Sequence, residues 1–330
     1  MNDASPAALL TEEFMVPSGD PGIEIFVRNK RRADLARYAP ENIVLFVHGA
    51  TYPAETSFDL QLEGLSWMEF IAGHGYDVYL MDVRGFGRST RPREMDEPPE
   101  KNPPVARTAT AAADLGAVVD FILHRCGVRK LCLLAWSWGT RITALYTAKN
   151  NDKVHRLALY APGWLRTSAS MTDPGGGLGA YRTVTVEAAK KRKRAGVPPE
   201  KVHVLMPDAW FDAWAGATFA TDPVGARQNP PVLRAPNGSV QDNREFWSAG
   251  QPQYDPAAIR VPTRLIVAEW DADNPPAMSQ ALFAVLTNAP YKRLVMIGEG
   301  THSVMIEKNR MQLFREVQLF LDEPSPSMKS

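Results

Sequence analysis

Residues 130–140 read Lys-Leu-Cys-Leu-Leu-Ala-Trp-Ser-Trp-Gly-Thr, and this stretch decides the fold. The apolar run Leu131–Ala135 has the length of a buried strand, and the residues after Gly139 have the spacing of a helix. A strand, a tight turn with a serine at its tip and a helix together expose the serine hydroxyl at a sheet edge. The turn needs small flanking residues, which Ala135 and Gly139 supply. Ser137 is therefore the predicted nucleophile.

A serine before a helix is also a favoured N-terminal cap, so the catalytic interpretation of Ser137 needs partners elsewhere. A serine hydroxyl is a weak nucleophile at neutral pH unless a base lies next to it. Of the six histidines, His302 stands in the loop Gly-Glu-Gly-Thr-His-Ser after the last predicted strand. Loops that follow parallel strands line one edge of a sheet, so we expect His302 to face Ser137.

A third partner of the site should be a carboxylate that orients the imidazole and stabilises its charged form. The loop after the predicted strand 263–268 reads Glu-Trp-Asp-Ala-Asp-Asn-Pro-Pro. It offers Glu269, Asp271 and Asp273 on the same edge as Ser137. Each of these could instead serve a turn or a helix cap, which aspartate favours.

Strands and helices alternate along much of the chain. An early antiparallel strand is predicted at 23–28, followed by strands at 43–48, 77–82, 131–135, 156–160, 263–268 and 293–297, and by helices at 57–72, 107–125, 141–149, 278–286 and 309–321. This pattern predicts an α/β fold with a doubly wound, mostly parallel sheet and helices on both faces.

The alternation breaks between about residues 162 and 256, where no clean strand is evident and Gly, Pro and Trp are frequent. We interpret residues 163–256 as an inserted, mainly helical cap. Residues 1–162 and 257–330 then form the core.

The chain resembles an α/β-hydrolase-fold protein with a cap, over most of residues 20–162 and 257–322. The resemblance rests on several short motifs in the proper order: His48-Gly49 after a buried strand, Asp82-Val-Arg-Gly-Phe-Gly-Arg-Ser89, Ala135-Trp-Ser-Trp-Gly139, the acidic loop at Asp271, and Gly300-Thr-His302. Two positions depart from the family pattern. Ala135 replaces the first glycine of the elbow, and Thr140 replaces a common small residue after it.

This resemblance implies a capped serine hydrolase of the esterase kind. Ser137 would be the nucleophile, His302 the base and Asp271 the orienting acid, in the chain order of α/β-hydrolases. Asp271 is preferred over its neighbours because Ala268 and Pro275 flank it with the spacing common in the family.

An oxyanion hole would use two backbone N–H groups. One belongs to Trp138, the residue after the nucleophile, and the other to Ala50 or Thr51 in the loop after the strand 43–48. We interpret His48 itself as structural. A hydrophobic substrate pocket is expected beneath the cap, since such pockets are largely apolar. The residues predicted to line it are Thr51, Trp136, Trp164, Trp210 and Trp214.

The strongest charge run is Lys190-Lys-Arg-Lys-Arg194. It could contact an anionic partner, but we interpret it as a solvated helix face, because the formal net charge of the chain is zero. The balanced charge also gives no reason to expect nucleic-acid binding.

Composition places the chain among ordinary globular proteins with two cysteines. Two thiols do not suggest a disulfide scaffold, and the N-terminus lacks the pattern of a signal peptide, so a reduced cytoplasmic protein is expected. No window approaches the length of a bilayer span, so stable membrane insertion is not expected. No metal or cofactor is implied, and the expected partner is a small-molecule ester.

The predicted function is hydrolysis of a moderately hydrophobic carboxylic ester or lactone through an acyl-enzyme. Three alternatives stay open, because fold and triad do not fix function. One is a prolyl-aminopeptidase-like enzyme, which would need acidic cap residues to hold a peptide amine. Another is cofactor-free hydrolysis or lysis of a carbon–carbon bond, and the third is a ligand receptor with slow turnover.

Overall fold

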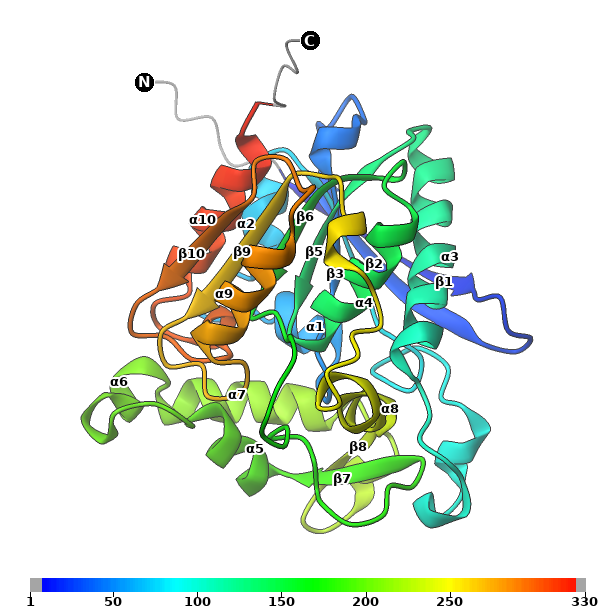
Figure 1. Cartoon of the computed structure of the whole chain (residues 1–330), viewed down its shortest axis with the longest axis vertical. Coiled ribbons are helices and arrows are strands. Elements are labelled where there is room, and N and C mark those ends of the chain that lie inside the picture. Colours follow the sequence, from blue (N-terminus) through cyan, green and yellow to red (C-terminus); the bar gives the residue numbers. More distant parts are fainter. Residues whose placement is uncertain (1–7, 325–330) are drawn as a thin grey trace.

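An eight-stranded sheet forms the centre of the computed structural model, which describes residues 8–324 (Figure 1). The spatial order of its strands is β1-β2-β4-β3-β5-β6-β9-β10. Strands β1 and β2 form an antiparallel hairpin that pairs antiparallel with β4, and all the other pairings are parallel. The strands are β1 (Leu9–Pro17), β2 (Glu24–Arg32), β3 (Ile43–Val47), β4 (Asp77–Met81), β5 (Leu131–Trp136), β6 (Val154–Tyr160), β9 (Thr263–Ala268) and β10 (Arg293–Ile297). The predicted mostly parallel sheet is confirmed.

Helices cover both faces of this sheet (Figure 1). Alternate residues of β3 belong to opposite hydrophobic clusters, as a strand buried on both faces requires. Val44 and Phe46 pack with α1, α2 and α10, and Leu45 and Val47 pack with α3, α4 and α9. These helices are α1 (Ala54–Phe58), α2 (Trp67–Gly73), α3 (Thr108–Cys126), α4 (Trp138–Lys149), α9 (Pro276–Val285) and α10 (Met311–Asp322).

The single helix predicted at 57–72 is wrong, because two short helices separated by a turn occupy this region. Glu63 and Gly64 both have positive φ values, and Leu62 and Leu65 pair across the turn. Ser66 then caps α2 by accepting a hydrogen bond from the Glu69 amide at 3.1 Å. The apolar spacing of the two helices is similar enough to imitate one.

The segment between β6 and β9 lies at the carboxyl ends of the strands, at the bottom of Figure 1. Its helices are α5 (Val186–Lys193), α6 (Val202–Leu205), α7 (Asp208–Phe219) and α8 (Gly238–Asp242). The expectation of no strand here is wrong: β7 (Tyr181–Thr185) and β8 (Val232–Pro236) form an antiparallel pair. Each of these strands is only five residues long, and they lie far apart in the sequence. The sequence therefore gives no local sign of their pairing.

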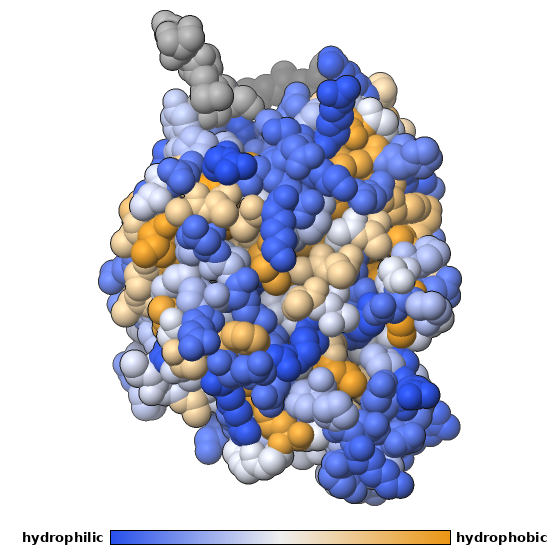
Figure 2. Space-filling model, turned by 45° about the vertical axis from the view of Figure 1, so that its right-hand side comes forward, coloured by the Kyte–Doolittle hydropathy of each residue, from blue (hydrophilic) through white to orange (hydrophobic). Residues whose placement is uncertain are grey.

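No helix among residues 8–324 is long and apolar enough to cross a membrane. On the face shown in Figure 2, hydrophilic residues predominate and hydrophobic residues form small separate patches. The core ranges 1–162 and 257–330 extend beyond the described residues at both ends.

Candidate active site

Ser137 occupies a sharp turn between β5 and α4. Its φ and ψ are +55° and −119°, a conformation that a non-glycine residue rarely adopts. The turn is compact because a side chain on Gly139 would place its Cβ 2.3 Å from the Val47 carbonyl oxygen, and one on Gly49 would lie 3.0 Å from Ser137 Cβ. Glycine at these two positions lets β3 and the turn approach each other closely. Strained turns of this kind are typical of functional sites.

Ser137, His302 and Asp271 form a chain of hydrogen bonds at the carboxyl edge of the sheet; we call these three residues the Ser–His–Asp chain. His302 Nε2 lies 2.8 Å from Ser137 Oγ, and His302 Nδ1 lies 2.8 Å from Asp271 Oδ2. An ionised carboxylate only accepts, so Nδ1–H donates to Asp271 and Nε2 is left to accept the serine hydroxyl. Asp271 Oδ1 also accepts from the amides of Asp273 and Asn274, which fix the carboxylate in place.

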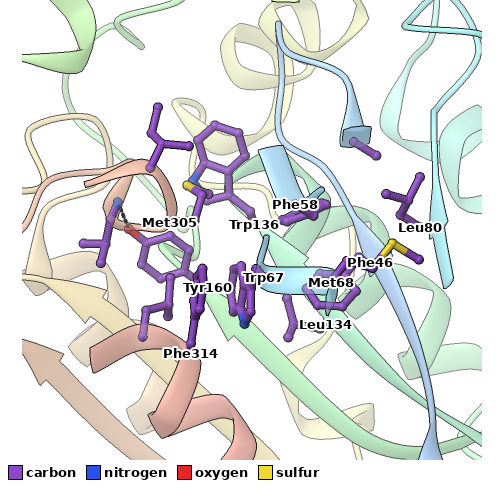
Figure 3. Close-up of a cluster of buried hydrophobic side chains, with 14 of the residues drawn as sticks. Phe46, Phe58, Trp67, Met68, Leu80, Leu134, Trp136, Tyr160, Met305 and Phe314 are labelled. Atoms are coloured by element: carbon purple, nitrogen blue, oxygen red, sulfur yellow. Dashed lines mark hydrogen bonds between the residues drawn. The ribbon is translucent and has the colours of Figure 1, made fainter. Parts of the chain in front are cut away.

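The loop that carries His302 is held from the core. Trp136 Nε1 donates to the His302 carbonyl at 2.8 Å, and the Tyr160 hydroxyl donates to the Thr301 carbonyl at 2.9 Å. Figure 3 shows Trp136 and Tyr160 in the buried cluster with Met305. Trp136 thus supports the histidine loop from beneath. The loop position therefore depends on the hydrophobic core.

Asp273 lies on the other side of His302 from Asp271. Its Oδ2 is 3.7 Å from His302 Nε2 and 2.9 Å from Arg192 Nε. Burial by itself would raise the pKa of Asp273, but the neighbouring guanidinium of Arg192 lowers it to about 2. Asp273 is thus an ionised partner of Arg192, whereas Asp271 contacts the histidine nitrogen that faces away from Ser137.

Ala50 and Trp138 both line the cavity at Ser137. No residue between 8 and 324 accepts a hydrogen bond from either amide, so both are available to a substrate oxygen. His48 fixes the neighbouring loop: its Nε2 accepts from the Val83 amide at 2.9 Å, and its Nδ1 donates to the Gly49 carbonyl at 2.7 Å. Complete burial lowers the pKa of His48 to about 4, so its ring is neutral at pH 7.

The cavity that reaches Ser137 is narrow and is lined mainly by polar side chains. Its lining residues are Ala50, Ser137, Trp138, Arg141, Arg166, Ser170, Thr172, Arg192, Ser239, Asn243, Asp273 and Asn274. We call Arg141, Arg166 and Arg192 the arginine wall. The sequence analysis did not assign Arg141 or Arg166 to the site, and it interpreted Arg192 as part of a solvated basic run. The motif offers a signal for Arg141 alone, which follows Ser137 by one helical turn.

The predicted aromatic lining is wrong for this cavity. Trp136, Trp210 and Trp214 are buried in one hydrophobic cluster, and Trp164 is buried in the other, where it packs against Trp247. These four rings help to pack the segment between β6 and β9 against the sheet. Thr51 borders a neighbouring hollow instead, where its Oγ1 accepts from Arg182 at 2.6 Å.

The interpretation of Lys190–Arg194 as a solvated face is wrong for two of its residues. Arg192 points into the site, and Lys193 is 4% exposed with its Nζ 3.9 Å from the centre of a Trp214 ring. Lys190 and Arg194 do face outward, where both pair with Asp208. A run of five basic residues on a helix necessarily turns some of them inward, and here buried partners receive them.

Comparisons with known proteins agree with the fold described above. Residues 42–180 match the family described as alpha/beta hydrolase fold. The chain has the α/β-hydrolase fold. A search of curated proteins gave no significant match.

Three similar solved structures extend the comparison over nearly the whole chain. A bacterial membrane phospholipase A is 20% identical with a TM-score of 0.62, covering 95% of this chain and 86% of its own. An esterase from Thermogutta terrifontis is 19% identical with a TM-score of 0.56, covering 94% and 98%. A 2-hydroxy-6-oxo-6-phenylhexa-2,4-dienoate hydrolase from Rhodococcus is 15% identical with a TM-score of 0.61, covering 95% and 99%. At these identities the likeness shows the fold.

Proposed function

We propose that this protein is a serine hydrolase that cleaves carboxylic esters through an acyl-enzyme on Ser137. The observation that carries the proposal is the continuous hydrogen-bonded chain from Ser137 Oγ through His302 to Asp271. Its position at a strained strand–helix turn, with two free amides beside it, is the arrangement that acyl transfer needs. The esterase and serine hydrolases among its structural neighbours support the same class.

The reaction follows from the positions of the atoms. Ser137 Oγ attacks the ester carbonyl carbon while His302 Nε2 takes the hydroxyl proton, and the amides of Ala50 and Trp138 stabilise the developing oxyanion. The carbon–oxygen bond to the alcohol then breaks, and His302 returns the proton to the departing alkoxide. Water attacks the acyl-enzyme by the same steps, which releases the acid and restores Ser137.

The polar cavity revises the expected substrate. An acyl group that contacts Arg141, Arg166 and Ser239 should be short or polar, because a long alkyl chain would leave charged groups without water or partners. The moderately hydrophobic substrate expected from the sequence is therefore not supported by this cavity.

A peptidase that binds a free amine is also not supported. The acidic cap residues available from the sequence lie elsewhere: Asp208 pairs with Lys190, and Glu245 pairs with Arg107. The one carboxylate in the cavity is that of Asp273, which is already paired with Arg192. A cationic cavity repels an ammonium group.

A chain-length series of p-nitrophenyl esters tests the proposal. We expect turnover of acetate to butyrate esters, falling for octanoate, and a loss of at least about 10⁴-fold in Ser137→Ala. Ser279→Ala is the matched control, since Ser279 is a fully buried serine on α9 outside the cavity. No turnover by folded protein, or equal turnover in Ser137→Ala, would contradict the ester assignment and return carbon–carbon cleavage to first place.

A further inference from the structure

The arginine wall contains more positive charge than its surroundings balance. Arg192 pairs with Asp273, but within residues 8–324 neither Arg141 nor Arg166 forms an ion pair. Arg141 is 4% exposed and donates to Asn243 Oδ1 and to the carbonyls of Gly163 and Trp164. Arg166 is 7% exposed and donates only to backbone carbonyls. Two guanidinium groups are therefore removed from water without a counter-charge in contact.

The other acids near these two arginines are already occupied. Asp242 pairs with Arg107, and Asp173 pairs with Arg244. Burial and, to a smaller extent, the neighbouring charge of Arg166 lower the pKa of Arg141 to about 9. Both groups stay charged at pH 7. A buried charge without a partner is strongly unfavourable, and an anion bound between the two would remove that cost.

A second observation points to a ligand at the same place. Ser239 lines the cavity, is 2% exposed, and its hydroxyl has no hydrogen-bond partner among the described residues. Buried hydroxyls are normally satisfied, so an unpaired one that borders a cavity indicates a missing acceptor or donor. An oxygen of a bound anion would accept from Ser239 Oγ.

The hollow next to the cavity at Ser137 is also lined by arginine side chains. It shares Thr172 and Arg192 with the cavity at Ser137 and is also bordered by Arg182 and Thr51. Arg182 is buried and donates to Thr51, to Asn237 and to the Pro236 carbonyl, without an ion pair in the described chain. Positive charge thus continues from Ser137 towards the segment that contains Thr172, and it would attract an anionic substrate along this path.

We propose that the substrate is an ester that carries a carboxylate, and that Arg141 and Arg166 bind this carboxylate while Ser137 attacks the ester carbonyl. The proposal rests on the serine-hydrolase function above. Guanidinium groups present paired N–H donors that match the two oxygens of a carboxylate. Half-esters of short dicarboxylic acids carry the required charge. Their hydrolysis releases a dicarboxylate and an alcohol by the steps already described.

The same molecule contains a buried arginine, Arg310, that resembles Arg141 in its contacts but lies outside the cavity. Arg310 is 5% exposed, donates to the Leu62 carbonyl and lies over the Trp210 ring, much as Arg141 lies over Trp247. Arg310 does not line the cavity at Ser137. A variant of Arg310 therefore shows what the loss of a buried arginine does without the loss of a substrate contact.

The test compares mono-p-nitrophenyl glutarate with p-nitrophenyl pentanoate, which has the same acyl length without the charge. We expect wild type to prefer the glutarate half-ester in kcat/KM by about 10- to 100-fold, the usual range for a charged hydrogen bond. Arg141→Gln and Arg166→Gln should lower kcat/KM for the half-ester far more than kcat/KM for the pentanoate ester, so that the preference falls to near one. Arg310→Gln should keep the preference.

A binding measurement on Ser137→Ala tests the same claim without turnover. Glutarate at millimolar concentration should raise its thermal unfolding midpoint, glutaramide should not, and the added substitution Arg141→Gln should abolish the rise. Ester turnover that depends on Ser137 but shows no preference for the half-ester would overturn this inference and leave the serine hydrolase intact. Turnover of both esters in Ser137→Ala would overturn the proposed function, and glutarate binding in that variant would still support the anion site.

Discussion

The Ser–His–Asp chain and the arginine wall meet at the cavity that Ser137 lines, but they are built in opposite ways. Ser137, His302 and Asp271 satisfy one another and the backbone around them, so their hydrogen bonds are complete without a ligand. Arg141 and Arg166 are buried with carbonyl and amide partners and no acid in contact. Side chains whose hydrogen bonds are complete need no ligand to hold them in position. Buried arginines without a counter-charge are suited to binding an anion. This difference supports the proposal that Ser137 and its partners cleave the bond and that the arginines select the substrate.

The largest expected effect separates the two carboxylates beside His302. Asp271→Asn should lower kcat about 10⁴-fold, because an amide no longer holds the imidazole in the tautomer that accepts the serine proton. Asp273→Asn should lower kcat by less than about 10-fold, because Asp273 pairs with Arg192. Steady-state kinetics on p-nitrophenyl acetate measure both, and the reverse order would mean that Asp273 is the orienting acid.

A smaller effect tests the elbow. Gly139→Ala would force the new Cβ against the Val47 carbonyl oxygen, so we expect a loss of about 1–3 kcal/mol in unfolding free energy. The displaced Ser137 should also lower kcat by about 100-fold. Chemical denaturation and ester turnover measure the two losses.

The control for the elbow is Gly116→Ala, in the interior of α3. A Cβ at Gly116 would lie 3.4 Å from the Tyr146 ring, an ordinary contact. That variant should keep or slightly gain stability, since alanine favours a helix over glycine. Equal stability of the two variants would show that the turn at Gly139 can relax.

The pH dependence of stability tests the buried ring of His48. Its pKa is lowered to about 4 in the folded protein, whereas the unfolded chain takes up a proton near the ordinary value of 6.5. The stability from neutral His48 is therefore present above pH 6.5 and lost as the pH falls towards 4. Relative to His48→Gln, wild type should lose about 3 kcal/mol over this interval. Parallel unfolding curves for the two proteins from pH 7.5 to 4 would contradict it.

The smallest expected effect concerns the aromatic residues that were predicted to line the site. Trp164→Phe and Trp210→Phe should change the preference between half-ester and neutral ester by less than about twofold, because both rings are packed in the core. The same kcat/KM ratio used for the arginine variants measures this. A shift as large as that of Arg166→Gln would place these rings in contact with the substrate.

Sequence alone predicted the parallel strands of the sheet and the positions of Ser137, His302 and Asp271, because each of these three residues lies in the connection that follows a strand. A residue at a strand end is fixed by the topology of the sheet, and the parallel order brings distant loops to one edge. The helices of the core were predicted from their apolar spacing, except where the turn at Gly64 divides one of them.

The arginine wall could not be predicted in the same way. Arg166 lies in irregular backbone, and Arg192 belongs to a basic run in which Lys190 and Arg194 face outward. Which side of a short helix such as α5 faces inward depends on contacts made by the whole cap segment. The tryptophans were wrongly predicted to line the cavity for a related reason. A large ring indicates burial, and a ring can be buried in a packed core as well as at a ligand.

Covalent trapping tests the central claim most directly. Wild type treated with diethyl p-nitrophenyl phosphate should gain one diethylphosphoryl group, which peptide mass spectrometry locates on Ser137. Labelling should be lost in Ser137→Ala and slowed greatly in Asp271→Asn, and should be unchanged in Ser279→Ala. Absence of the adduct in folded wild type, or its location on a different residue, would contradict the assignment of Ser137 as the nucleophile.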